Sequence, residues 1–220
     1  MSLTLVFDLD GTLAETAPDL IGALNFVLAG DGVAPVPVEA ARSMLGAGGR
    51  ELISRGYARA GRDLTPARLD QLFAEFLGFY NAHIADKSAL FPGVEACLDR
   101  CAAAGWRLAV CTNKLEYSSI LLLEKLGVRD RFAFICGQDT FGVAKPDPKP
   151  LRETVARAGG RLDRSVMIGD SLTDIRTARA AGMPVVAVDF GYTDVPVAEL
   201  GPDRVISHFD ALDAAVRALT

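Results

Sequence analysis

Residues 3–12 of the chain read LTLVFDLDGT, and this stretch is the starting point for predicting the fold. Its first half, Leu3–Phe7, is a short and continuous apolar run, which is typical of a strand that is buried on both faces. Its second half is polar and contains a glycine, which indicates a tight turn directly after the strand. The stretch therefore predicts a buried strand that ends at two carboxylates, those of Asp8 and Asp10.

The sequence after residue 91 alternates between segments with helical spacing and short apolar runs. Helices are predicted over residues 94–104, 117–126, 150–158, 172–181 and 211–219, and strands over residues 108–111, 132–136, 166–168, 185–188 and 205–206. Strands that alternate with helices predict a parallel sheet with helices on both faces. The predicted fold class is therefore α/β.

The stretch between the first strand and this alternating part has a different character. Its apolar residues recur at helical spacing, as in Leu20 and Leu24, and prolines and glycines separate the helical stretches. We expect an all-helical insert over residues 16–85. Residues 1–15 and 86–220 then form the core.

Composition and charge exclude several classes of protein. Half of the residues are apolar and 23% are charged, which is typical of a globular chain rather than a disordered one. The net charge of −5 and the lack of a basic run argue against binding to nucleic acid. No apolar stretch has the roughly 18–20 residues that cross a bilayer, and the first residues do not resemble a signal peptide. We therefore expect a cytoplasmic protein without a membrane partner.

The four cysteines are expected to be buried, reduced thiols. Cys97 and Cys101 lie on one predicted helix, and Cys111 and Cys136 lie in apolar runs that resemble strands. A metal cluster needs closer pairs with exposed flanks, so we expect these cysteines to pack as small apolar side chains.

Polar side chains follow the predicted strands at the points where the strands end. In parallel sheets, ligands bind beyond the carboxyl ends of the strands, so these side chains form the candidate site. They are Asp8 and Asp10 after the first strand, Thr112 and Asn113 after the second, Lys145 in the loop after the third, and Asp170 with Asp174 after the fourth. Each also fits an ordinary polar turn, a loop lysine or a helix cap, but their order along the chain favours one site.

The acidic residues of this group require a positive charge between them. Two carboxylates ~5 Å apart repel by about 3 kcal/mol at an effective dielectric near 20, and one lysine cannot neutralise Asp8, Asp10 and Asp170. A divalent cation can, and an all-oxygen ligand set suits Mg²⁺. The sequence therefore predicts Mg²⁺ as the cofactor.

The remaining polar groups suit a phosphoryl group. Thr112, Asn113 and Lys145, together with free backbone N–H groups after each strand, can bind its oxygens. A carboxylate such as Asp8 can attack phosphorus and form an aspartyl phosphate. A second acid two residues on, Asp10, can protonate the leaving oxygen and later activate water. The pattern therefore predicts phosphoryl transfer.

With these residues in place, the chain resembles the haloacid dehalogenase-like hydrolase superfamily over its whole length. The matching motifs are residues 8–13 (DLDGTL), the strand that ends at Thr112, Lys145–Pro146, and Gly169–Asp170 with Asp174. The resemblance implies a Rossmann-like parallel sheet core with helices on both faces and an all-helical cap domain inserted after the first strand.

The resemblance also implies roles for these residues, in two groups. The metal ligands are Asp8, Asp10 through its backbone carbonyl, Asp170, and Asp174, which supports the site or joins it through water. The residues that hold the phosphoryl group are Thr112 and Lys145, with Asn113 beside it. In addition, Asp8 is the nucleophile, and Asp10 is the general acid and base.

Within the superfamily, the chain is most similar to the phosphoglycolate phosphatases, which implies hydrolysis of 2-phosphoglycolate to glycolate and phosphate. The similar stretches are residues 16–20, 45–52, 91–94, 112–114, 190–192 and 202–203. One departure is Glu15, where this subgroup usually carries Asp. In the cap, Gly49 and Arg50 are expected to bind substrate, because closure of the cap could bring the Arg50 guanidinium to the substrate carboxylate. The alternative for Arg50 is a surface arginine at a helix start.

Other interpretations remain open. One is a phosphatase of the same fold that acts on a sugar phosphate or pyrophosphate, and another is a phosphomutase similar to β-phosphoglucomutase. A dehalogenase has no use for an acid at Asp10, and a binding module without catalysis would not need the complete set of groups. For the phosphatase, we expect a small-molecule phosphate ester as partner, no nucleic acid or membrane partner, and a monomer or homodimer.

Overall fold

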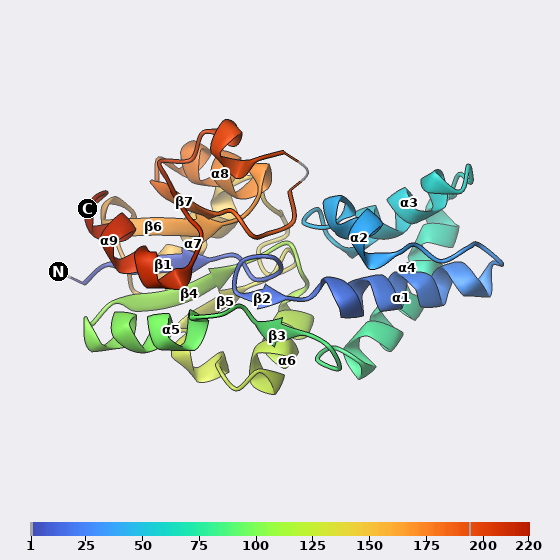
Figure 1. Cartoon of the computed structure of the whole chain (residues 1–220), viewed down its shortest axis with the longest axis horizontal. Helices are drawn as coiled ribbons and strands as arrows, with labels where there is room; N and C mark the ends of the chain where they lie inside the picture. The colour runs from blue at the N-terminus through green and yellow to red at the C-terminus, as the bar shows by residue number, and fades with distance from the viewer. Residues whose placement is uncertain (1, 194) are drawn as a thin grey trace.

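A parallel sheet forms the centre of the molecule (Figure 1). The computed structural model describes residues 2–193 and 195–220, so Met1, where the predicted core begins, lies outside the described residues. Within them, one sheet has six parallel strands in the order β5-β4-β1-β6-β7-β8. The strands are β1 (Thr4–Phe7), β4 (Arg107–Cys111), β5 (Phe134–Cys136), β6 (Ser165–Gly169), β7 (Val185–Val188) and β8 (Arg204–Ile206). The strand order reverses beside β1, and ligands bind at such a reversal in sheets of this kind.

The strand β1 is buried on both faces and paired on both sides. Its residues alternate between two apolar clusters, with Leu5 and Phe7 on one face of the sheet and Val6 on the other. At its carboxyl end, Phe7 is level with Val110 of β4 and with Ile168 of β6. The residues that follow these three strands therefore lie at the same edge of the sheet.

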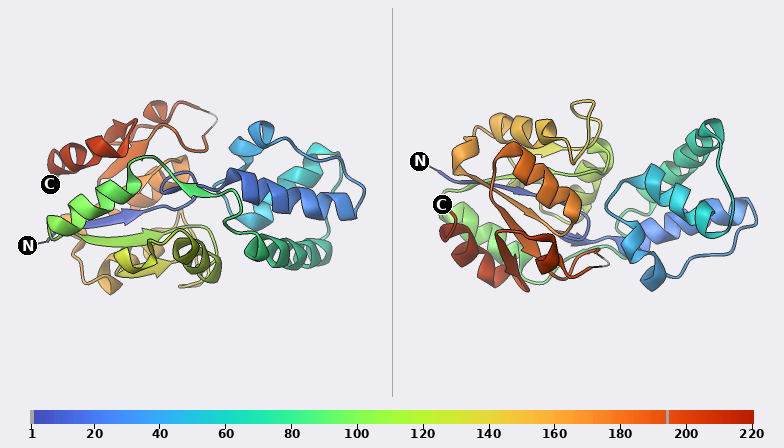
Figure 2. Two further views of the ribbon diagram at one scale, coloured as in Figure 1. Left: turned by 60° about the horizontal axis from the view of Figure 1, so that its bottom comes forward. Right: turned by 90° about the horizontal axis from the view of Figure 1, so that it is seen from above.

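Helices cover both faces of the sheet (Figures 1 and 2). Those that share the apolar cluster of Leu5 are α5 (Val94–Ala103), α6 (Glu116–Lys125) and α9 (Leu212–Arg217). Those that share the cluster of Val6 are α7 (Pro148–Arg157) and α8 (Leu172–Ala181). Gly182 ends α8 with a φ of 74°, a left-handed conformation that glycine adopts without steric cost. The predicted α/β fold, a parallel sheet between two layers of helices, is confirmed.

A second group of helices lies at one end of the molecule and forms the all-helical cap (Figure 2). The cap helices are α1 (Ala17–Gly30), α2 (Val38–Ala41), α3 (Gly49–Arg59) and α4 (Pro66–Ala82). Helix α4 begins with Pro66 in its first turn, and Thr65 Oγ1 accepts a hydrogen bond from the Arg68 N–H at 3.2 Å. Gly56 of α3 lets this helix approach α1, because a Cβ there would lie 2.8 Å from the Leu24 side chain.

Two short strands connect the cap to the core. The strand β2 (Ala14–Glu15) pairs antiparallel with β3 (Ala89–Leu90), so both passages of the chain lie side by side. A strand of two residues is too short to show alternation, which is why the sequence did not predict this pair. Nearby, the N–H groups of Thr16 and Ala17 donate to the Tyr192 hydroxyl at 2.6 and 2.9 Å. These hydrogen bonds fix the start of α1 against a loop of the core.

The predicted boundaries need small corrections. The third predicted strand begins at Phe134 rather than at residue 132, because the short helix η2 (Arg129–Arg131) precedes it. The last helix is preceded by the short helix η5 (Phe209–Ala211), so α9 begins at Leu212. The other short helices of the described chain are η1 (Arg42–Met44), η3 (Leu162–Arg164) and η4 (Val197–Leu200). As expected, all four cysteines are buried and free.

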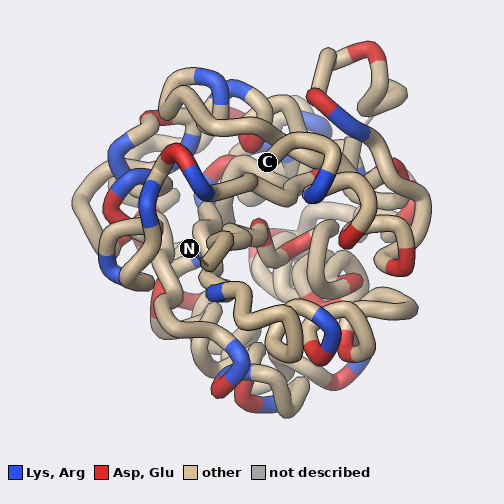
Figure 3. Tube along the Cα trace, turned by 90° about the vertical axis from the view of Figure 1, so that its left-hand side faces the viewer, with Lys and Arg blue, Asp and Glu red and all other residues tan. Residues whose placement is uncertain are grey.

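Charged residues of both signs are interspersed along the chain in Figure 3. Several form exposed ion pairs between elements, such as Arg131 with Asp99 at 2.5 Å and Arg100 with Asp213 at 3.2 Å. Exposed pairs of this kind each contribute little to stability, typically ~0–1 kcal/mol. Among the described helices, none has the length and apolar character needed to cross a membrane.

Candidate active site

The carboxyl ends of the central strands bring Asp8, Thr112 and Asp170 to one edge of the sheet. The Asp8 N–H donates to the Ile168 carbonyl at 2.8 Å, so the pairing of β1 with β6 extends to the first acidic residue. One carboxylate oxygen from each of Asp8, Asp170 and Asp174 lies within 4.8 Å of the others. Three acids from two distant parts of the sequence, Asp8 on one side and Asp170 with Asp174 on the other, thus meet in space.

Lys145 lies between two of these acids. Its Nζ is 2.9 Å from Asp8 Oδ1 and donates to Asp174 Oδ1 at 2.6 Å, and its side chain is 2% exposed. Burial lowers the pKa of Lys145, but the charges of Asp174 and Asp8 outweigh it and keep the pKa above the ordinary value. Burial raises the pKa of Asp8 from 3.8 to about 6, although Lys145 opposes this shift. One ammonium group therefore does not compensate for the burial of this carboxylate.

Asp174 is held at the start of α8 by a capping box. Ser171 Oγ accepts from the Asp174 N–H, and Asp174 Oδ2 accepts from the Ser171 N–H and hydroxyl at 3.1 and 2.7 Å. Its other oxygen accepts from Lys145. Both oxygens of Asp174 are therefore engaged. This arrangement favours a supporting role, in which Asp174 orients Lys145, rather than direct contact with a metal ion.

Asp170 is fixed by hydrogen bonds to both of its oxygens. Thr12 Oγ1 donates to Oδ1 at 3.0 Å, and the Tyr192 N–H donates to Oδ2 at 2.7 Å. Burial, followed by the neighbouring carboxylates, raises the pKa of Asp170 well above its ordinary value. The turn after β1 packs directly against this group, because a Cβ at Gly11 would lie 2.5 Å from Asp170 Oδ2. Gly11 also has a φ of 82°, so glycine suits this position for two reasons.

The donor set of this cluster fits Mg²⁺. Asp8 Oδ1 is buried and has no hydrogen bond of normal geometry. The raised pKa values of Asp8 and Asp170 mean that their charged forms lack sufficient compensation. A small divalent cation with oxygen ligands would supply it, with the Asp8 and Asp170 carboxylates as ligands.

Asn113 connects the strand end at Thr112 to the loop that carries Lys145. Its Oδ1 accepts from the Lys145 N–H at 3.0 Å, and its Nδ2 donates to the Lys145 carbonyl at 3.2 Å. The same Nδ2 reaches the Gly46 carbonyl of the cap at 3.4 Å. Asn113 therefore holds the backbone of Lys145 in place and touches the cap, while its expected position beside the phosphoryl group stays a prediction.

Lys114 is a site residue to which the sequence pattern assigned no role. Its Nζ donates to Asp10 Oδ1 and Oδ2 at 2.9 and 2.8 Å, and lies 4.6 Å from the centroid of the Tyr80 ring. Asp10 Oδ1 also accepts from Thr16 Oγ1 at 2.7 Å. The signal for Lys114 was its position directly after Thr112 and Asn113, but nothing in the sequence indicates which acid it reaches.

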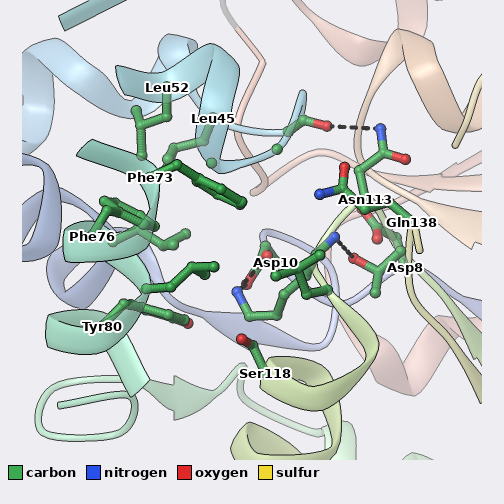
Figure 4. A pocket seen from close by; sticks show the side chains of 18 residues that line it. Asp8, Asp10, Leu45, Leu52, Phe73, Phe76, Tyr80, Asn113, Ser118 and Gln138 are labelled. Carbon is green, nitrogen blue, oxygen red and sulfur yellow. Dashed lines mark hydrogen bonds and ion pairs between the residues drawn. The ribbon is translucent and has the colours of Figure 1, made fainter. Parts of the chain in front are cut away.

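A cavity of about 50 Å³ lies between the core and the cap (Figure 4). Figure 4 shows Phe73, Phe76 and Tyr80 of α4 on one side of it, and Asp10 and Ser118 of the core facing them. The full lining consists of Asp8, Asp10, Leu20, Leu45, Gly46, Gly48, Gly49, Leu52, Phe73, Phe76, Leu77, Tyr80, Thr112, Asn113, Lys114, Leu115, Ser118 and Gln138. The cavity therefore opens onto both acids of the motif after β1.

The two cap residues named from the sequence are placed differently. Gly49 lines the cavity and packs closely on α4, since a Cβ there would lie 3.0 Å from the Phe73 ring. Arg50 is absent from the described lining, and its NH1 lies 2.5 Å from Asp70 Oδ1. Its guanidinium also stacks over Phe73 at 4.5 Å, with 48% of the side chain exposed. This conformation does not bring Arg50 to the substrate pocket.

The chain belongs to the haloacid dehalogenase-like hydrolase family, whose sequence profile matches residues 5–188. The matched range contains the whole acidic cluster and the cap, so fold and site point to the same family. The resemblance that the sequence motifs suggested is thereby confirmed.

Individual relatives carry names that are more specific than that of the family. The chain is 52% identical to a phosphoglycolate phosphatase of Mesorhizobium japonicum over 94% of this chain and 92% of that protein. A crystal structure from Haemophilus somnus, described as a predicted phosphoglycolate phosphatase, superimposes with a TM-score of 0.90 at 28% identity, covering 97% of both chains. A variant of CbbY from Rhodobacter sphaeroides, in complex with xylulose-(1,5)bisphosphate, gives a TM-score of 0.83 at 29% identity over 98% of this chain and 99% of that one.

Proposed function

We propose that the chain is a Mg²⁺-dependent phosphatase that hydrolyses 2-phosphoglycolate to glycolate and phosphate through a phosphorylated aspartate. The observation that carries the proposal is the buried Asp8 carboxylate, held 2.9 Å from Lys145 Nζ and open to a small cavity. A carboxylate in such a position can attack phosphorus, and the ammonium can stabilise the transferring oxygens. The names of the relatives at 52% and 28% identity support this choice of substrate.

The reaction divides into two steps that these residues can perform. In the first, an Asp8 carboxylate oxygen forms a bond to phosphorus while the bond from phosphorus to the ester oxygen breaks, and Asp10 gives its proton to that oxygen. In the second, Asp10 takes a proton from water, the water oxygen attacks phosphorus, and the bond to Asp8 breaks. Thr112 and Lys145 hold the phosphoryl oxygens in both steps. When bound, Mg²⁺ supplies positive charge that offsets the charge of the acids and phosphoryl oxygens.

Asp174 acts through Lys145 in this proposal. It accepts a hydrogen bond from Lys145 Nζ at 2.6 Å, and its other oxygen is held by Ser171. The expectation that Asp174 is a metal ligand is therefore retained only in its weaker form, as support of the site or a contact through water. For Arg50 to bind the substrate carboxylate, as the sequence led us to expect, its guanidinium would have to leave Asp70.

A phosphatase that acts on a sugar bisphosphate is the second candidate. The CbbY variant, at 29% identity, was solved with xylulose-(1,5)bisphosphate, which favours this alternative. In this candidate Asp8 would again be the phosphorylated aspartate, because in this fold the core performs the chemistry and the cap selects the substrate.

The test is a panel of phosphate esters with the full chain. We expect the highest kcat/KM for 2-phosphoglycolate among 2-phosphoglycolate, xylulose 1,5-bisphosphate, glucose 1-phosphate and pyrophosphate, and loss of activity with EDTA that Mg²⁺ restores. A higher kcat/KM for a sugar bisphosphate would support the second candidate instead. Conversion of glucose 1-phosphate to its 6-phosphate without release of phosphate would indicate a phosphomutase.

A further inference from the structure

The cavity between core and cap contains one buried positive charge. Among the described residues that line it, Lys114 is the one with a cationic side chain, and that side chain is 5% exposed. Its ammonium lies against both oxygens of Asp10 and over the ring of Tyr80, so it sits where the core meets the cap.

One donor beside Lys114, the hydroxyl of Tyr80, is not fully used. The three protons of the Lys114 ammonium point to the two oxygens of Asp10 and toward the Tyr80 oxygen. The Tyr80 hydroxyl is buried, with 1% of the residue exposed, and has no hydrogen bond of normal geometry. Burial raises the pKa of Tyr80 to about 12, so the hydroxyl keeps its proton. Buried polar groups without partners are rare in proteins, which indicates that a ligand fills this place.

The position of Lys114 determines how far from the ester oxygen an anionic group of the substrate must lie in order to be bound. The proposed acid, Asp10, must contact the ester oxygen of the substrate, and Lys114 Nζ lies within 2.9 Å of its carboxylate. In the phosphate ester of a 2-hydroxy acid, one carbon separates the ester oxygen from the carboxyl carbon, so a carboxylate oxygen lies only ~3 Å from the ester oxygen. The second phosphate of a sugar bisphosphate lies several bonds farther away.

The size of the cavity agrees with a short substrate. A volume of about 50 Å³ has room for roughly four water-sized groups. The part of 2-phosphoglycolate beyond its ester oxygen has a similar size, since it consists of one methylene and one carboxylate. The apolar rings of Phe73 and Phe76 line the same cavity and give a longer polar chain no partner.

We propose that Lys114 and the Tyr80 hydroxyl bind the carboxylate of the substrate and thereby select phosphate esters of two-carbon 2-hydroxy acids. The inference rests on the proposed phosphatase function and specifies how its substrate is recognised. It assigns this recognition to a lysine of the core rather than to Arg50, whose guanidinium lies against Asp70.

The test compares two substrates that differ only in the carboxylate, 2-phosphoglycolate and ethyl phosphate. In Lys114→Met, kcat/KM for 2-phosphoglycolate should fall by about 100-fold or more, mainly through KM, whereas the loss for ethyl phosphate, which comes only from the lost support of Asp10, should be at least about 10-fold smaller. In Tyr80→Phe, the loss for 2-phosphoglycolate should be about 3- to 10-fold. The control Lys125→Met, at an exposed lysine of α6, should match the wild type on both substrates.

Other outcomes would overturn the proposal. Equal losses on both esters would mean that Lys114 only positions Asp10, and unchanged kinetics would mean that it has no part in recognition. If Lys114→Met does not fold, as judged by circular dichroism, the selective loss in Tyr80→Phe decides the question, and its absence counts against the proposal.

A binding measurement separates this inference from the proposed function. In an Asp8→Asn background, calorimetric titration should give at least about 10-fold weaker binding of 2-phosphoglycolate when Lys114→Met is added, with a clearly smaller effect for ethyl phosphate. If the wild type releases phosphate from no ester, the proposed function fails, but this titration still tests Lys114. Equal affinity for 2-phosphoglycolate with and without Lys114 would overturn the inference whatever the activity.

Discussion

The two walls of the active-site cavity differ in chemistry and in how they are held. The core wall carries Asp8, Asp10 and Lys114 at the ends of strands, and ion pairs join Asp10 to Lys114 and Asp8 to Lys145. The cap wall presents Leu52 and Phe73 from helices, and apolar packing holds it in place. Reactive groups need mutual electrostatic support, whereas the apolar side chains of the cap wall, which exclude water, need only the right shape.

This difference makes the core wall sensitive to single substitutions. Removal of one charged partner there leaves another buried charge without compensation, which is costly. On the cap wall, an exposed side chain can change with little consequence for the chemistry.

The largest effect is expected for Asp8→Asn, which removes the nucleophile. We expect kcat for 2-phosphoglycolate to fall by at least about 10⁴-fold, because the covalent step needs a carboxylate oxygen. The fold should remain, since asparagine has the same shape. Phosphate release and circular dichroism measure the two effects, with the exposed Asp99→Asn as control. Activity within about 10-fold of the wild type would remove Asp8 from this role.

A smaller effect on rate, combined with an effect on stability, is expected for Lys145→Met. The substitution leaves Asp8 and Asp174 buried without their shared cation, which should cost about 3–5 kcal/mol in the free energy of unfolding of the metal-free protein. We expect kcat to fall by about 10²- to 10³-fold, because a donor to the transferring oxygens is lost.

Urea titration and steady-state kinetics measure these changes. The exposed Lys149→Met, four residues along the chain, is the matched control. Added Mg²⁺ should stabilise Lys145→Met more than the wild type, since it restores positive charge beside the acids. An unchanged free energy of unfolding in the metal-free variant would contradict the view that Lys145 compensates these acids.

The pH dependence of stability gives a third test of the core wall. The pKa of Asp8 rises from 3.8 to about 6 on folding, so the folded state binds this proton more tightly than the unfolded chain. The metal-free protein should therefore lose on the order of 3 kcal/mol through this group as the pH rises from about 4 to about 6, with no further loss above. Urea titrations of the wild type and Asp8→Asn should diverge across that range. Parallel curves would mean that folding does not shift the pKa of Asp8.

The smallest effect is expected for Arg50→Ala on the outer side of the cap. Its guanidinium pairs with Asp70 and is half exposed, so kcat/KM for 2-phosphoglycolate should change by less than about 3-fold. Asp70→Ala, which removes the other partner, should behave in the same way. A large loss confined to Arg50→Ala and to 2-phosphoglycolate would show that the cap rearranges and that this arginine reaches the carboxylate.

The core wall could be predicted from the sequence to a large extent. Asp8 and Asp170 each follow a short apolar strand, and a parallel sheet must bring such strand ends to one edge. Their meeting therefore follows from local pattern and topology together. The alternation of strands and helices likewise predicted the α/β fold, because each element carries its own periodicity.

The cap wall and its contacts with the core were less accessible to prediction. In the sequence, Tyr80 is one more apolar position on a helix, and nothing distinguishes its buried hydroxyl from a core tyrosine. Lys114 was visible beside Thr112, but its pairing with Asp10 depends on how two loops of the core meet, and its contact with Tyr80 depends on the packing of α4 against the core. Arg50 fitted a plausible role, yet its partner on α4, Asp70, is set by the distance between two helices.

In the proposed reaction Asp8 carries the phosphoryl group during turnover, so the decisive experiment is to trap this phosphorylated residue. The full chain is mixed with 2-phosphoglycolate and Mg²⁺, quenched in acid within one turnover, digested, and analysed by mass spectrometry. We expect the peptide with Asp8 to gain the mass of one phosphoryl group, and we expect this signal to disappear in Asp8→Asn. Phosphate release without any phosphorylated peptide, or a phosphoryl group located on another residue, would contradict it.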